Sequence, residues 1–75
     1  MKKFHWIAYY TVWLIDGNEE DRQTEAFEAG NIREALAIAQ EKTRKIVREN
    51  PEVTNTFVYD VGIIERGGYF EEVQE

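Results

Sequence analysis

The sequence predicts an α+β domain in which one helix covers one face of a four-stranded antiparallel sheet. Three observations support this fold class. Residues 4–15 form an apolar run that is too short to cross a membrane and is rich in the β-branched and aromatic residues typical of strands. Residues 32–49 carry apolar residues at helical spacing. The turn-forming segments 16–18 and 67–68 separate further short strands. At 75 residues, the chain is expected to be a single domain spanning 1–75.

The first strand, residues 4–15, is apolar on both faces. Side chains on a strand alternate between the two faces of its sheet, and a strand with one wet face should alternate apolar with polar residues. Because the chain offers one helix, something else must cover the second face, and a second copy or a partner protein is the simplest candidate. Either face could meet the helix. One face carries Phe4, Trp6, Ala8, Tyr10, Val12 and Leu14, and the other carries His5, Ile7, Tyr9, Thr11, Trp13 and Ile15.

The second strand is expected from Arg22 to Ala29, after a hairpin turn at residues 16–18. Asp-Gly and Gly-Asn dipeptides favour the positive φ angles of tight hairpins. The strand reads RQTEAFEA, and Phe27 is its one large apolar residue. This polar pattern predicts an edge strand protected by charge.

The helix is expected from Ile32 to Glu49. Asn31 is a favourable N-cap, and Glu34 three residues later completes a capping-box pattern. Pro51 ends the helix, because proline disfavours helical geometry in the residue before it. Ile38 lies off the apolar stripe, where it contacts either the sheet edge or a partner. The stripe itself comprises Ile32, Ala35, Leu36, Ala39, Thr43, Ile46 and Val47.

The third strand is expected over residues 56–66, and a short fourth strand over 69–73. The bulkier face of the third strand would carry Phe57, Tyr59, Val61 and Ile63, whereas Gly62 on its other face permits close approach of the helix. The predicted topology is ββαββ with spatial strand order 2-1-3-4 and every neighbouring pair antiparallel. We therefore expect an interface on the uncovered face, formed by Ile7, Tyr9, Trp13, Phe57, Tyr59 and Val61.

The charge is negative and segregated. Fifteen acidic residues against nine basic ones give a net charge of −6, which disfavours direct binding to nucleic acid or to anionic membranes and is compatible with a basic protein partner. The absence of cysteine fits a reducing, cytoplasmic location. The chain also has an acidic tail and a group of cations late in the helix. An acidic surface is expected from Asp16, Glu19, Glu20, Asp21, Glu25 and Glu28.

No residue pattern indicates a catalytic, cofactor-binding or metal site. His5 is the single histidine, and only Asp60 or Glu65 on a neighbouring strand would be placed to orient it as a catalytic base. A calcium loop beginning at Asp16 fails, because its sixth and twelfth positions hold Asp21 and Phe27 in place of glycine and glutamate. No cofactor is therefore expected, and the chain is predicted not to be an enzyme.

The leading hypothesis is a non-enzymatic protein–protein interaction module that forms a homodimer through an apolar sheet face. Such a module would regulate or inhibit another protein, as small proteins encoded by phages or mobile elements do. One alternative is an acidic decoy that mimics nucleic acid and occupies the basic cleft of a DNA- or RNA-binding protein. Another is a small enzyme acting at a dimer cleft through His5 or Asp60.

Overall fold

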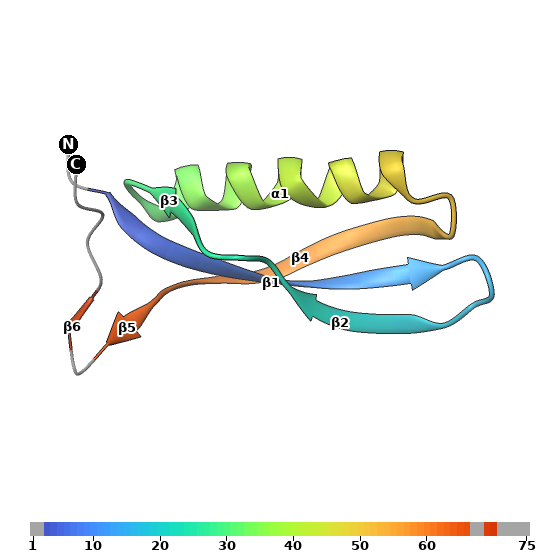
Figure 1. The fold of residues 1–75 in the computed structure, drawn as a ribbon, viewed down its shortest axis with the longest axis horizontal. Helices are drawn as coiled ribbons and strands as arrows, with labels where there is room; N and C mark the ends of the chain where they lie inside the picture. Colours follow the sequence, from blue (N-terminus) through green and yellow to red (C-terminus); the bar gives the residue numbers. More distant parts are fainter. Residues whose placement is uncertain (1–2, 67–68, 71–75) are drawn as a thin grey trace.

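A computed structural model describes residues 3–66 and 69–70, and it confirms the predicted fold class. One helix packs on an antiparallel sheet in a small α+β domain (Figure 1). In chain order the elements are β1 Phe4–Leu14, β2 Glu19–Gln23, β3 Phe27–Ala29, α1 Ile32–Glu49, β4 Val53–Ile63, β5 Glu65–Arg66 and β6 Tyr69–Phe70.

β1 is the central strand of the sheet. It pairs antiparallel with β2 and β3 along one side and with β4 along the other. β5 follows β4 after a single residue and pairs antiparallel with β6 in a separate two-stranded ladder. The predicted neighbours are found: the segments of the second predicted strand (β2 and β3) and of the third (β4) flank β1. The fourth predicted strand is represented by β6, which pairs with β5 beyond the end of β4. Residues 67–68 and 71–73, which belong to the expected last turn and strand, lie outside the described residues.

The predicted second strand is divided into two. β2 begins at Glu19, earlier than expected, and the strand is interrupted after Gln23 before β3 resumes at Phe27. Tyr9 pairs with Gln23 whereas Trp6 pairs with Phe27, so this side of the hairpin contains one extra residue. At the interruption, the backbone N–H of Ala8 donates to Thr24 Oγ1 over 3.1 Å, and the N–H of Thr24 donates to the carbonyl of Ala8 over 2.9 Å. A threonine side chain thus replaces one backbone acceptor of the ladder.

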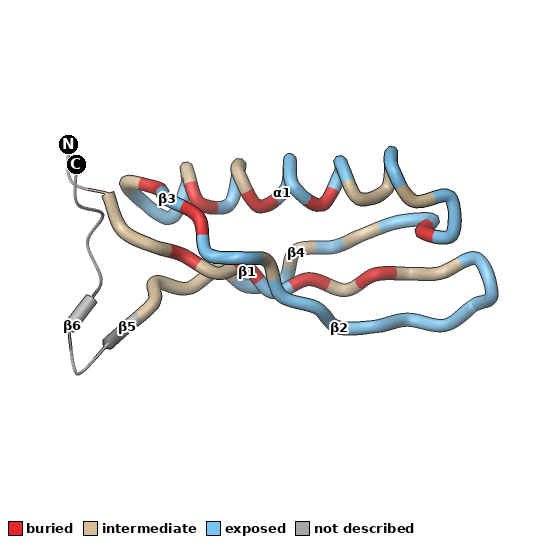
Figure 2. Tube along the Cα trace, viewed as in Figure 1, coloured by how far each residue is buried: buried red, intermediate tan, exposed pale blue. Residues whose placement is uncertain are grey.

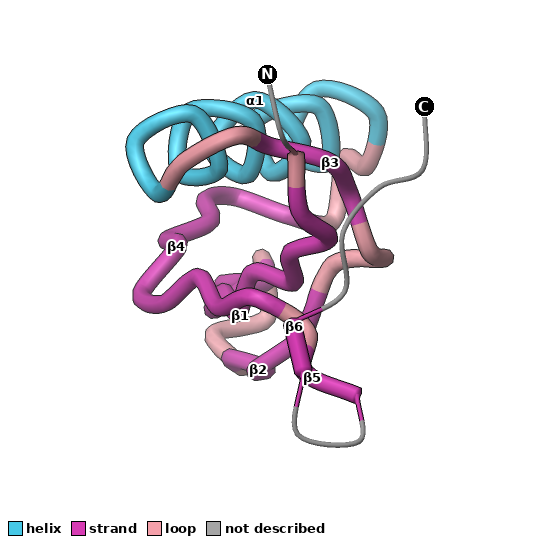
Figure 3. Tube along the Cα trace, turned by 90° about the vertical axis from the view of Figure 1, so that its left-hand side faces the viewer, coloured by secondary structure: helices cyan, strands magenta, loops and turns pink. Residues whose placement is uncertain are grey.

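α1 covers one face of the sheet and decides which side of β1 is the core (Figure 3). The buried side chains of β1 are Trp6, Ala8, Tyr10 and Val12, all on the same face. The first two belong to a cluster that includes Ala35 and Ala39 of the helix, and the last two belong to a second cluster towards the C-terminal end of the helix (Figure 2). The face carrying Tyr9 and Trp13 is therefore directed away from the helix.

The predicted helix boundaries are confirmed at both ends. Asn31 is the N-cap, and its Oδ1 accepts a 2.9 Å hydrogen bond from the N–H of Glu34. At the other end, the backbone N–H and the side-chain amide of Asn50 both donate to the carbonyl of Ile46, before the chain turns at Pro51. Both ends thus satisfy backbone groups that a helix otherwise leaves unpaired.

Loss of the N-cap has a measurable consequence. Asn31→Ala is expected to lower the free energy of unfolding by about 1 kcal/mol, because the N–H of Glu34 loses its acceptor. Asn31→Asp retains an acceptor oxygen at the same place and is the matched control. Urea denaturation followed by far-UV circular dichroism measures both changes. Equal stability of the alanine variant and the parent would contradict the role of this cap.

The helical stripe is rotated relative to the predicted one. Ala35, Ala39 and Thr43 are the buried helical residues, whereas Ile32 is 62% and Leu36 39% exposed. Ile38, which was expected at the margin, packs against the core cluster. The prediction placed Ile32 and Leu36 on the same stripe as the alanines. In the structure the small side chains occupy the line of contact, because they allow the helix to lie close to the sheet.

Two irregularities in β4 change which of its residues share a face. The register against β1 shifts between Asp60 and Val58 and again between Asn55 and Val53. Because Tyr59 is the extra residue at the first shift, strict alternation fails there. Val61 and Ile63 lie opposite Ala8 and Trp6 and pack on the core, so the prediction that they share a face with Phe57 is wrong.

Candidate interaction surface

The side of β1 and β4 that faces away from α1 forms a partly apolar surface, here called the open face. Its positions follow from the register: Ile7 lies opposite Gly62, Tyr9 opposite Asp60 and Thr11 opposite Phe57. Residues that lie opposite one another in antiparallel strands project to the same side of the sheet. The open face therefore carries Ile7, Tyr9, Thr11, Trp13, Asn55, Phe57 and Asp60. Tyr59 has no partner in the register, and it is counted with this face because it lines a hollow together with Tyr9.

The aromatic residues of this face are accessible to solvent. Phe57 is 57% exposed, Tyr59 51% and Tyr9 37%, whereas Trp13 and Ile7 are half-buried. Contiguous exposed aromatic side chains are uncommon on monomeric proteins and mark sites of interaction. Five of the six residues proposed for the interface thus lie on the open face, and Val61 does not.

Tyr9 and Tyr59 line a shared hollow at the edge of the open face. Tyr10 of β1 and Asp21, Arg22 and Gln23 of β2 line the same hollow, which has a volume of about 530 Å³. Tyr59 reaches this position because it is the extra residue of the bulge in β4. Tyrosine rings bordered by a carboxylate, an amide and a guanidinium provide both apolar area and polar groups for a partner.

The predicted acidic surface lies along one edge of the sheet. Asp16 in the turn, all five residues of β2, and Glu25 and Glu28 beyond it are exposed. Arg22 donates a 2.7 Å hydrogen bond to the carboxylate of Glu20. This hydrogen bond raises the pKa of the Arg22 guanidinium. Asp21 accepts a hydrogen bond from the Thr11 hydroxyl over 2.9 Å. Glu19 and Asp21 lie opposite Trp13 and Thr11 and form an acidic rim beside the open face, whereas Glu20 lies opposite Val12 and projects to the other side of the sheet.

The sequence offered His5 and Asp60 as a possible catalytic pair, and the structure separates them. His5 is opposite Glu28 in the β1–β3 ladder, whereas Asp60 is opposite Tyr9, four residues further along β1. At about 3.3 Å per residue, this spacing amounts to about 13 Å along the strand. The side chain of Glu65 is outside the described residues. Within the described part of the chain, no three histidine, aspartate or glutamate side chains gather as a metal site would require.

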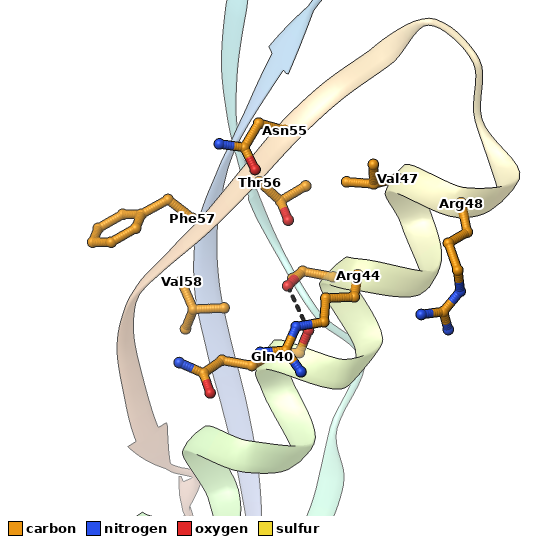
Figure 4. Close-up of a pocket in the computed structure, with 9 residues that line it drawn as sticks. Gln40, Arg44, Val47, Arg48, Asn55, Thr56, Phe57 and Val58 are labelled. Atoms are coloured by element: carbon orange, nitrogen blue, oxygen red, sulfur yellow. Dashed lines mark hydrogen bonds between the residues drawn. The ribbon is translucent and has the colours of Figure 1, made fainter.

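A groove between α1 and β4 was not anticipated from the sequence. It has a volume of about 450 Å³ and lies along the side of β4 that is not paired with β1 (Figure 4). From the sequence, the helix cations are expected on a solvated face, with a phosphate or an acidic partner as the alternative ligand. Their position beside β4 could not be predicted, because it depends on the rotation of the helix. The groove is lined by Gln40, Thr43, Arg44, Val47 and Arg48 of the helix and by residues 55–58 of β4.

Comparisons of this chain with models of protein families, with curated proteins and with solved structures found no match. In the part of the chain that the structure describes, no helix has the length and apolar character needed to cross a membrane.

Proposed function

We propose that this chain is a non-enzymatic protein–protein interaction module of the cytoplasm that self-associates through its open face and regulates or inhibits another protein. The observation that supports it is the exposure of Tyr9, Phe57 and Tyr59 on the side of the sheet that α1 leaves bare. Burial of such aromatic residues against a second sheet stabilises an interface by removing apolar surface from water.

The acidic rim restricts how two copies can meet. Glu19 and Asp21 lie opposite Trp13 and Thr11, so they border the open face along β2, and Asp60 lies across the face on β4. Two sheets that pack face to face cross at an angle. Such a crossing brings the aromatic centres together while the carboxylate rims diverge into solvent.

The solution mass tests this proposal. Light scattering over a range of concentrations should show a species of twice the 8.9 kDa chain mass for the parent. Tyr59→Glu should shift the mass to that of one chain, because a charged carboxylate replaces a half-exposed phenol and would have to lose its water at the contact.

Tyr59→Phe keeps the ring and removes the hydroxyl, so this control should retain the dimer. Far-UV circular dichroism of both variants establishes that each is folded. A parent that stays at the mass of one chain throughout, or a Tyr59→Glu variant that remains dimeric, would contradict self-association through the open face.

A second candidate function is the acidic decoy, which is favoured by the complete exposure of β2. Carboxylates on both sides of an exposed edge strand can be presented to a basic cleft without rearrangement of the core. Binding of this kind weakens steeply with ionic strength, whereas binding through aromatic burial does not. Partner affinity measured across salt concentrations, with Tyr59→Glu as the comparison, therefore separates the two functions.

A further inference from the structure

The two outer edges of the sheet differ in how they are protected. β2, at one edge, has the sequence EEDRQ and is exposed throughout. β4, at the other edge, has the sequence VTNTFVYDVGI, in which Asp60 is the single charged residue. Exposed edge strands are normally guarded by charge, because their free N–H and C=O groups can pair with another chain. The edge of β4 that faces away from β1 is paired with no other described strand along Val53–Ile63.

Bulges also protect edges, and those of β4 leave a regular segment between them. The register shifts place the irregular residues at Thr54 and Tyr59. Residues 55–58 pair with β1 in regular register between these two positions, and the same four residues line the groove beside α1. The unpaired edge and the groove therefore coincide.

The wall of the groove on the helix side is positively charged. Arg44 and Arg48 both approach the carboxylate of Glu41, over 3.8 and 3.2 Å, so one negative charge is shared between two guanidinium groups. Both arginine side chains are at least 60% exposed. No acidic residue lines this groove among the described side chains. Guanidinium groups bind carboxylates through paired hydrogen bonds, which favours an acidic occupant.

We infer that the groove binds an extended acidic peptide segment of a partner protein, which adds to the β4 edge as a further strand. This inference deepens the proposed function and rests on the chain being an interaction module. Main-chain hydrogen bonds to residues 55–58 provide affinity, and alternate side chains provide specificity. Side chains directed towards α1 meet Arg44 and Arg48, whereas those directed to the opposite side lie beside the exposed ring of Phe57. The preferred segment therefore alternates acidic with apolar residues.

Charge also argues against a symmetric pairing of β4 with β4 of a second copy. A two-fold axis at residues 55–58 would place the second copy of α1 beside the first, with Arg44 and Arg48 of each copy directed towards the other. Like charges at a desolvated contact are unfavourable. An acidic strand meets no such repulsion.

The test is a titration of the isotope-labelled full-length chain with the peptide TEVEVET, acetylated and amidated, followed by amide chemical shifts. Shift changes are expected at residues 55–58 and 40–48. The peptide TQVQVQT, which keeps the strand propensity and lacks the carboxylates, should bind roughly tenfold more weakly, as should TEVEVET to the Arg44→Gln/Arg48→Gln variant. Lys45→Gln is the matched control, because Lys45 pairs with Glu49 and does not line the groove.

Strand addition has a second signature. Alternate residues of an added strand direct their N–H groups towards β4, so methylation of one alternate set of peptide nitrogens should abolish binding and methylation of the other set should not. Equal binding of both methylated peptides, equal binding of TQVQVQT, or shift changes centred on Tyr9 and Tyr59 would overturn the inference. Concentration-dependent shifts at residues 55–58 without peptide would also overturn it, because the edge would then be taken by a second copy. These outcomes are independent of the mass of Tyr59→Glu, which tests the open face.

Discussion

Trp6→Ala is expected to remove a large part of the free energy of unfolding of this chain. Trp6 is 5% exposed within the larger core cluster, and its indole N–H donates a 2.9 Å hydrogen bond to the carbonyl of Ala29. Truncation of a buried tryptophan costs about 3–5 kcal/mol. A chain of 75 residues has a total stability of about 4–11 kcal/mol. The substitution therefore removes a large part of the total, together with the side-chain hydrogen bond that joins β1 to β3 at this position.

Two further variants separate the contribution of the indole hydrogen bond from that of the buried ring, and the core face of β1 from its open face. Trp6→Phe keeps an aromatic ring but cannot donate to Ala29, so it should lose less stability than Trp6→Ala. Trp13→Ala removes the other tryptophan from the same strand, on the open face, where it is half-buried. Urea denaturation at a concentration where the chain is monomeric should show the smaller loss for Trp13→Ala. A loss as large as that of Trp6→Ala would show that the open face is covered within one chain.

The sequence predicted that β1 is apolar on both faces but could not predict which face the helix covers. Both faces of this strand carry one tryptophan and at least one tyrosine, so composition does not distinguish them. The distinction comes from the partner strands. Phe27 and Ala29 of β3 lie opposite Trp6 and Phe4 and complete the core on that side, whereas Glu28 lies opposite His5.

The sequence predicted which residues share the open face, except where the backbone departs from regular alternation. A residue that is inserted into one strand of an antiparallel pair moves all later side chains to the opposite face. Tyr59 is such a residue, and it explains why Phe57 is exposed while Val61 packs on the core. No glycine or proline in the segment Phe57–Val61 marks the bulge, because its position depends on pairing with β1.

The two edges of the sheet give the molecule opposite electrostatic surfaces. The β2 edge is acidic and exposed, and the β4 edge borders the groove that holds Arg44 and Arg48. The acidic edge was predicted, because its residues are contiguous in the sequence. The basic groove was not, since it depends on the packing of α1 against β4. In the proposed dimer, which uses the open face, both edges would remain free for other partners.

Ala39→Leu is expected to have the second large effect on stability. Ala39 is fully buried in the core cluster, on the line where α1 contacts the sheet. A leucine here adds three carbon atoms where the packing depends on an alanine, and it displaces the helix or forces strained rotamers. Such overpacking costs about 1–3 kcal/mol. The groove between α1 and β4 should also change shape, because both of its walls move relative to one another.

Ala37→Leu is the matched control for Ala39→Leu, because Ala37 lies on the same helix and is exposed. The same chemical change there should alter the free energy of unfolding by less than about 0.5 kcal/mol. Urea denaturation compares the two variants, and amide shifts of residues 55–58 report any displacement of the groove. Equal stability of the two leucine variants would show that the sheet accommodates a larger residue at position 39, and that the small side chains of the helix do not determine its distance from β1.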